Sequence, residues 1–265
     1  MARMIDKKQN RQCRLNSWLI EHASKGRSSD VARLLAQGAD ARASCSEALI
    51  VAALAGHAEC VRLLIPFSDP LSRMSRALFN ASRGGHAKCV ELLLPTSNAL
   101  AGESQALCMA ARLGHSDCVA LLIPYSDPLG NNSKPLREAA SQGRPECVRL
   151  LIPVSNPKAE RCEALISAAL AGCAECCDLL APHSDLSALI SQAIPTAVRS
   201  HARALPALLK HLPFGDSNLH GLPALRARAL NAKRMEAASM LEAFIVEQSI
   251  GKPLADLPRA KAFRI

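Results

Sequence analysis

A pair of adjacent leucines recurs along this chain at a fixed interval of 29 residues. The seven pairs begin at Leu34, Leu63, Leu92, Leu121, Leu150, Leu179 and Leu208, with no insertion or deletion between them. Self-similarity at a period of roughly 20–50 residues is the signature of an array of stacked structural repeats. Such an array offers one long surface in place of a single pocket. The repeat therefore favours binding over catalysis.

The first half of each repeat has the pattern of an amphipathic helix. A serine before an apolar stretch is typical of a helix N-cap, because its hydroxyl can accept a hydrogen bond from a free backbone N–H. An apolar column three residues later and an alanine column three residues after that predict one buried helix face. The serine column is Ser17, Ser46, Ser75, Ser104, Ser133, Cys162 and Ser191; the apolar column is Ile20, Leu49, Leu78, Leu107, Leu136, Leu165 and Ile194; the alanine column is Ala23, Ala52, Ala81, Ala110, Ala139, Ala168 and Ala197.

The second half of each repeat predicts a turn and another helix. Glycine ends a helix well because it adopts positive φ, and Arg27 and His201 replace it in the end copies. The second helix runs through the leucine pair and is expected to stop at a proline, before polar turn residues. The glycines are Gly56, Gly85, Gly114, Gly143 and Gly172, and the prolines are Pro66, Pro95, Pro124, Pro153 and Pro182. No stretch alternates long enough for a strand, so we predict an all-α fold.

Several segments resemble the ankyrin repeat. Residues 52–64 (AALAGHAECVRLL) and 110–122 look like the core of that repeat, and residues 135–139 (PLREA) are similar to its T-P-L-H-x-A signature. Residues 33–40 (RLLAQGAD) resemble the ending that leads from its second helix into the hairpin. TPR repeats of 34 residues and HEAT or armadillo repeats of about 40–47 residues do not fit this unit.

The period departs from the ankyrin pattern. Ankyrin repeats usually have 33 residues, whereas these have 29. The missing residues fall where ankyrin repeats carry their β-hairpin finger. The resemblance thus implies an ankyrin-like solenoid of about seven or eight helix-turn-helix repeats, with shortened loops in place of the fingers.

Charge and periodicity divide the chain into four parts. The net charge is +9, yet residues 17–221 carry 19 basic and 18 acidic residues, so the excess lies at the two ends. We expect a basic N-terminal segment over 1–16, ankyrin-like repeats one to seven over 17–221, a degenerate capping repeat over 222–249 and a basic tail over 250–265. Terminal repeats are expected to be atypical because one of their faces meets water.

The cysteines have a structural interpretation. Five of the 11 cysteines form one 29-residue column whose ends are Val31 and Leu205. A position that accepts Val, Leu or Cys is a small buried apolar site, so we expect reduced core thiols in a reducing compartment. The column is Cys60, Cys89, Cys118, Cys147 and Cys176.

His57 and Cys60 have a spacing that zinc sites use, but a closed site needs four converging ligands, and we expect no metal. Cys173, Cys176 and Cys177 form the densest thiol cluster.

Catalytic and targeting motifs are missing from the sequence. There is no G-x-S-x-G, P-loop or H-E-x-x-H motif, so we predict a non-catalytic protein without a cofactor. Residues 1–16 have no apolar core of a signal peptide, and no run of 18 apolar residues predicts a membrane span. We therefore expect a cytoplasmic protein, and the Ala-, Arg- and Leu-rich composition is compatible with a bacterial origin. The sequence does not decide export to a host cell or oligomeric state.

The resemblance also indicates where a partner would bind. In ankyrin-like folds the first helix of each repeat lines a concave groove. The residue after the serine and the two residues before the glycine are the positions that this helix exposes at the surface of the groove. These positions vary here, while the packing columns barely change. Arginine beside exposed apolar residues is the composition of interface hot spots. The candidate residues in repeats three to five are Arg76, Arg83, Met109, Arg112, Leu113, Lys134 and Arg137.

Three functions remain open at this stage. The first is a protein-interaction scaffold, adaptor or regulatory subunit whose partner has an acidic or mixed surface. The second is a secreted effector that binds a host protein. The third is a nucleic-acid-associated factor that uses the basic termini, which an aromatic content of only 3% disfavours. The alternative for the candidate residues is an ordinary solvated helix face. Trp18 is expected to close the first repeat against the N-terminal segment.

Overall fold

The computed structural model describes residues 2–212 and 221–250, and it confirms the all-α class: every regular element of these residues is a helix. Two compact units divide the chain. Unit 1 comprises residues 1–139 and 153–155, and unit 2 comprises residues 140–152 and 156–265. Each unit is described by itself below.

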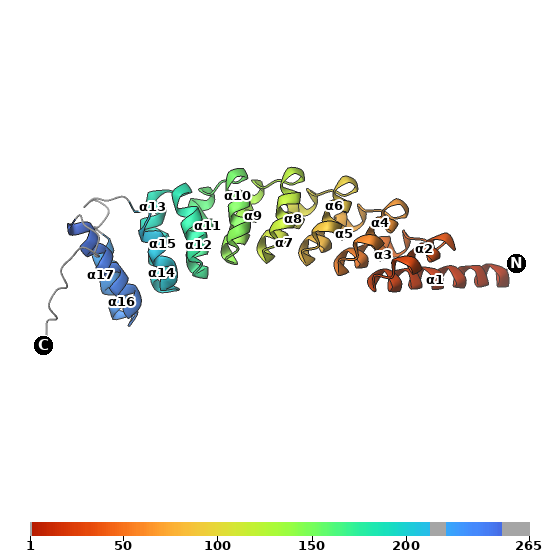
Figure 1. Ribbon diagram of the computed structural model, residues 1–265, viewed down its shortest axis with the longest axis horizontal. Helices are drawn as coiled ribbons and strands as arrows, with labels where there is room; N and C mark the ends of the chain where they lie inside the picture. Colours follow the sequence, from red (N-terminus) through yellow and green to blue (C-terminus); the bar gives the residue numbers. More distant parts are fainter. Residues whose placement is uncertain (1, 213–220, 251–265) are drawn as a thin grey trace. The chain divides into compact units, whose positions relative to one another are not determined.

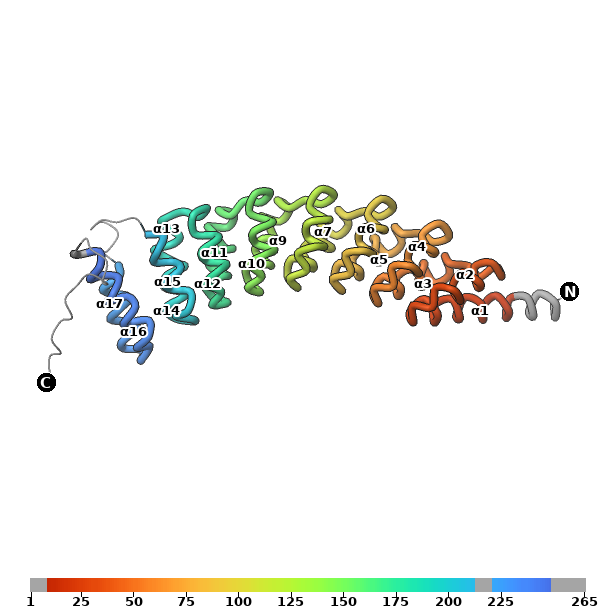
Figure 2. Tube along the Cα trace, in the orientation of Figure 1, coloured from red at the N-terminus to blue at the C-terminus, as the bar shows by residue number. Residues whose placement is uncertain are grey.

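Unit 1 consists of helix pairs in two rows (Figure 1; Figure 2). The inner helices α1, α3, α5 and α7 pack one against the next, and so do the outer helices α2, α4, α6 and α8. Helix α9 begins in this unit and ends two residues into unit 2. The helices are α1 (Ala2–Ser24), α2 (Ser28–Ala36), α3 (Ala43–Ala55), α4 (Ala58–Leu64), α5 (Ser72–Gly84), α6 (Ala87–Leu93), α7 (Ala101–Leu113), α8 (Ser116–Leu122) and α9 (Gly130–Ser141), with the 3-10 turns η1 (Ile65–Phe67), η2 (Leu94–Thr96) and η3 (Ile123–Tyr125).

Unit 2 contains the later repeats. Helix α12 packs against α10 and α15, and α11 packs against α14. The last two helices, α16 and α17, pack against each other as a helix pair, and their role as a capping repeat stays a prediction. The elements are α10 (Pro145–Leu151), α11 (Ala159–Ala171), α12 (Ala174–Leu180), η5 (Ala181–His183), α13 (Leu186–Ala188), the π-helix η6 (Leu189–Ala193), α14 (Ile194–Arg199), η7 (Ala202–Ala204), α15 (Leu205–Leu209), α16 (Leu222–Asn231) and α17 (Met235–Ile250). The 3-10 turn η4 (Ile152–Val154) has its first residue in unit 2 and its other two in unit 1.

The two predicted terminal segments have different outcomes in the structure. Helix α1 runs without interruption past residue 17, so the expected boundary between residues 16 and 17 lies inside a helix. Of the predicted basic tail, residues 251–265 lie outside the described residues.

The repeating columns build the core. The apolar column is completely buried at Leu49, Leu78 and Leu107, and the alanine column is buried with it. Fully burying a leucine contributes about 1.5–3 kcal/mol. The small alanines let neighbouring inner helices approach closely, which explains why these columns barely vary along the chain.

The second helix of each repeat ends slightly differently from the prediction. The α-helix in the second repeat ends at Leu64, and Pro66 then lies inside the 3-10 turn η1. Proline lacks the N–H that an α-helix needs but tolerates the start of a new turn. Proline therefore converts the helix into one tighter turn, and the polar loop follows.

A left-handed turn opens five of the inner helices. Three consecutive residues, Ser44, Cys45 and Ser46, have φ of 52–59°, and an equivalent left-handed triplet occurs in the first turn of α5, α7, α9 and α11. Left-handed backbone costs roughly 1–2 kcal/mol for a residue other than glycine, so neighbouring contacts must hold it. The turn occupies the place of the β-hairpin finger.

The serine column holds this turn through a contact between repeats. Ser75 Oγ accepts a hydrogen bond from the backbone N–H of Asn98, 23 residues later, at 2.8 Å. Ser46 and Ser104 accept equivalent bonds at 2.9 Å from the loops that follow them. The N-cap interpretation was therefore wrong for these serines, because their oxygen serves the next repeat's loop. Their strict spacing reflects a contact between layers.

The column changes character at both ends of the array. Ser17 lies within α1 and donates to the carbonyl of Cys13, and Ser191 lies within the π-helix η6. Neither has left-handed backbone. The N-cap prediction also fails at these two positions, because the helices continue through them.

Glycine and histidine form a second contact between repeats in unit 1. Gly85 ends α5 with a φ of 73°, and a Cβ on it would lie 2.5 Å from the imidazole of His115. The ring therefore packs directly over the glycine, and its Nε2 donates to the carbonyl of Arg83 at 3.1 Å. His57 and His86 bond in the same way to the carbonyls of the preceding repeat. Glycine is needed both for its backbone and for the space above it.

The Gly–His contact predicts a specific pattern of destabilisation. Gly85→Ala should lower the midpoint of urea unfolding more than Gly38→Ala. Both place alanine at positive φ, at a cost of about 1–2 kcal/mol, but Gly38 has nothing within 4 Å of the new Cβ. Adding His115→Ala to Gly85→Ala should recover part of the loss. Equal midpoints for the two alanine variants would contradict the steric role of the ring.

The serine contact predicts a stabilising substitution. Cys162 takes the serine's place in unit 2, and its Sγ accepts from the N–H of Asp185 at 3.3 Å. Sulfur is a weak acceptor, so Cys162→Ser should raise stability by about 0.5–1 kcal/mol, the worth of a typical hydrogen bond. The reciprocal change Ser75→Cys should lower it, and thermal unfolding measures both. A fall in the melting temperature of Cys162→Ser would count against this explanation.

Candidate protein-binding surface

The seven predicted residues lie on three inner helices of unit 1. We call them the inner-helix patch: Arg76 and Arg83 on α5, Met109, Arg112 and Leu113 on α7, and Lys134 and Arg137 on α9. Helices α5 and α7 are packed neighbours.

The patch residues differ in exposure. The side chains of Arg76, Arg83, Arg112 and Leu113 are exposed, while Met109 and the two α9 residues are half-buried. Arg76 and Arg83 are seven residues apart, which places them on one face of α5, two turns from each other. The exposed cations therefore concentrate on α5 and α7.

Phe79 supports one of these arginines. The Arg76 guanidinium lies 4.7 Å from the centroid of the Phe79 ring, one turn along α5. A cation over an aromatic face contributes about 0.5–1 kcal/mol at an exposed site. Sequence reasoning missed Phe79. The arginine and the aromatic residue three positions later were a usable signal, because residues at that spacing are neighbours on a helix.

A carboxylate makes the α9 end of the patch mixed in charge. Glu138 lies 3.8 Å from Arg112 and one turn after Lys134 on α9. Lys134 and Glu138 also affect the pKa of the buried Cys108 thiol. Burial raises that pKa to about 11; in addition, Lys134 lowers it and Glu138 raises it. Glu138 was also missed, although it stands at the same repeat position as the candidate Met109, because its approach to Arg112 depends on the packing of α9.

Arg137 has a structural task that the sequence did not indicate. Its Nη2 donates to the backbone carbonyl of Asn131 at 3.0 Å. Asn131 belongs to the left-handed turn, with a φ of 49°. The half-buried Arg137 thus braces the turn ahead of its own helix. Arg76, Arg83 and Arg112 are the better placed cations for contact with a partner.

Corresponding positions in other repeats are not all cationic. Leu54 and Leu170 occupy the repeat position of Arg83 and Arg112, and their side chains are 46% and 59% exposed. Exposed leucine there shows that packing does not dictate this position. The outward residue of each inner helix is therefore open to selection for recognition.

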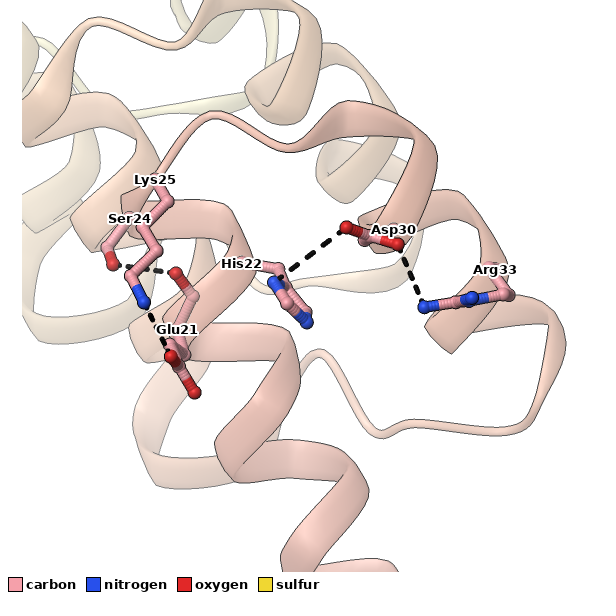
Figure 3. Close-up of polar contacts among 6 residues, drawn as sticks. All are labelled: Glu21, His22, Ser24, Lys25, Asp30 and Arg33. Carbon is pink, nitrogen blue, oxygen red and sulfur yellow. Dashed lines mark hydrogen bonds and ion pairs between the residues drawn. The ribbon is translucent and has the colours of Figure 1, made fainter.

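The first repeat presents a different surface. Lys25 pairs with Glu21 at 2.6 Å, and His22 of α1 faces Asp30 of α2 at 4.0 Å (Figure 3). The hydrogen bond from Lys25 lowers the pKa of Glu21. The His22–Asp30 pair joins α1 to α2, while Lys25 and Glu21 pair at the C-terminal end of α1, which balances the charge of Lys25 locally.

Trp18 lies beside its own helix turn. The Arg14 guanidinium is 5.7 Å from the centroid of the Trp18 ring, and the side chain is 45% exposed. Both residues border an open cavity of 540 Å³ that extends to Gln37. Trp18 thus contacts Arg14 one turn upstream in α1 but stays largely exposed, and its closure of the first repeat remains a prediction.

The core thiols have a packing role. Cys60, Cys89, Cys118, Cys147 and Cys176 are all completely buried. Burial raises the pKa of both the Cys89 and the Cys147 thiol to about 11, which keeps them protonated at neutral pH. Within residues 2–212 and 221–250, no group of three or more His, Cys, Asp or Glu side chains could hold a metal ion. None of the helices described is long and apolar enough to cross a membrane.

Comparisons with known proteins agree with this architecture. The family model for ankyrin repeats (3 copies) matches residues 19–103 and 107–192, which together exceed half of the chain. The crystal structure of the human ASB11 ankyrin repeat domain is similar in fold, with a TM-score of 0.62 at 24% identity, over 74% of this chain and 97% of that one. No curated protein sequence matches the chain. Because the family model covers more than half of the chain, the chain belongs to the ankyrin-repeat family.

Proposed function

We propose that this protein is a non-catalytic scaffold, adaptor or regulatory subunit that binds a partner protein through the inner-helix patch. Ankyrin-repeat domains are generally protein-binding modules. The observation that supports this proposal most directly is the set of exposed arginines on the neighbouring helices α5 and α7, with exposed Leu113 beside them. The partner surface that complements this set is acidic or of mixed charge.

The energetics of interfaces support this assignment. Arginine can form bidentate hydrogen bonds with carboxylates and can stack on apolar groups, so it is enriched among hot spots. Leu113 and half-buried Met109 supply apolar area between the cations. Exposed charges also steer association, so the on-rate should fall as salt rises.

The proposal is tested by charge reversal at two exposed positions. Arg83→Glu combined with Arg112→Glu should weaken binding of the partner by at least about tenfold, since hot-spot truncations cost about 2 kcal/mol or more. The full-length protein, immobilised on beads, would capture partners from source lysate. Mass spectrometry identifies them, and titration calorimetry with the purified partner gives the dissociation constant.

A matched control carries the same charge change on the outer helices. Arg62→Glu on α4 combined with Lys88→Glu on α6 alters two cations that are 59% and 68% exposed. This variant should bind as the unmodified protein does. Circular dichroism checks that both variants keep their helices. Equal binding by both double variants would reject the inner-helix patch as the interface.

A further inference from the structure

Cys173 and Cys176 in unit 2 place two thiols in direct contact. Their Sγ atoms are 3.0 Å apart, with the Cys173 thiol donating to the sulfur of Cys176. The Cys173 sulfur also accepts from the backbone N–H of Cys176 at 3.4 Å. A disulfide has an S–S length of about 2.05 Å, so an approach of roughly 1 Å would close the bond.

This pair arises from one departure in the repeat pattern. Cys173 stands where His57, His86 and His115 stand in unit 1, and Cys176 belongs to the buried cysteine column. In those three repeats the imidazole bonds to the carbonyl of the preceding repeat. In the sixth repeat a thiol takes the histidine's place. The sixth repeat is the one repeat in which a second cysteine stands three residues before the cysteine of the buried column.

We propose that Cys173 and Cys176 form a reversible oxidation site, at which a low-molecular-weight disulfide such as oxidised glutathione converts the two thiols into an intrachain disulfide. Exposure sets the order of events. Cys173 is half-exposed, whereas Cys176 is completely buried. Only Cys173 is accessible to the external oxidant. Cys176 then reacts with the mixed disulfide that forms on Cys173.

The reaction proceeds by two thiol–disulfide exchanges. The Cys173 thiol loses its proton and attacks one sulfur of oxidised glutathione, which forms a mixed disulfide; the released glutathione thiolate takes up that proton. Cys176 then attacks the Cys173 sulfur, and its proton goes to the sulfur of the second glutathione as that group leaves. Two protein thiols are oxidised, and one oxidised glutathione is reduced to two glutathione molecules.

Cys177 provides an internal comparison. It is also completely buried, and burial raises the pKa of its thiol to about 12. The only sulfur–sulfur contact in this cluster joins Cys173 and Cys176, among the residues that the structure describes. Proximity in sequence alone would not distinguish Cys176 from Cys177, so pairing with Cys176 tests the geometry.

The site lies at a joint between two repeats. A Cβ on Gly143, the turn glycine of the preceding repeat, would lie 3.3 Å from the Cβ of Cys173. Cys173 therefore packs over this glycine as the histidines of unit 1 pack over theirs. Oxidation would pull its sulfur toward Cys176 at this joint.

Oxidation of the full-length protein tests the proposal. The reduced protein would be incubated with a series of ratios of oxidised to reduced glutathione, quenched in acid, alkylated under denaturing conditions and digested. Mass spectrometry should find the peptide with the Cys173–Cys176 link lighter by two hydrogen atoms, and Cys177 alkylated. The link should disappear on treatment with dithiothreitol.

Two variants separate chemistry from folding. Cys173→His installs the residue of the second to fourth repeats and should abolish the link without loss of helical circular dichroism. Cys177→Ala should retain the link. A persistent mixed disulfide on Cys173, pairing with Cys177, or thiols that stay reduced in a large excess of oxidised glutathione would each overturn the proposal.

Discussion

Successive repeats in unit 1 are tied together by hydrogen bonds to backbone groups that the short turns leave unpaired. The oxygen of Ser75 takes up a loop N–H of the next repeat, and the Nε2 of His115 takes up a carbonyl at the end of α5. An unpaired buried backbone group costs about 1–3 kcal/mol. Replacing the β-hairpin finger by a left-handed turn is tolerable because the serine bond holds the turn, while the histidine bond secures the other end of the helix.

The same constraint explains what varies along the array. A serine must reach 23 residues forward, and a glycine must leave room for an imidazole, so these positions repeat with the core columns. The side chains at the outward positions of the inner helices make neither contact, since only the backbone carbonyls of Leu54 and Arg83 bond to histidine, and these positions hold Leu54, Arg83 or Arg112. Recognition can thus change without any change in the scaffold. The proposed oxidation site arises where Cys173 replaces the histidine of one such contact.

The helix positions of the candidate residues were predictable from the sequence, but only some of their contacts were. The spacing of Arg76 and Arg83 on one helix face follows from helical geometry. The bracing of the left-handed turn by Arg137 and the approach of Glu138 to Arg112 join residues across a turn or between helices. Such contacts depend on how the helices pack, so the sequence assigned Arg137 to binding although it also supports a turn.

The sequence by itself determined the helical class, the repeat length and the buried columns, because helical periodicity and glycine turns are local properties that recur in register. Only the tertiary structure decided what the serines do. Their hydroxyls resemble N-caps in the sequence, yet Ser46 bonds to the loop that comes 23 residues later. It also decided that Cys173 touches Cys176 and that three left-handed residues open the inner helices. These features depend on packing between neighbouring repeats and on the backbone geometry that this packing stabilises. The sequence of a single repeat does not encode such contacts.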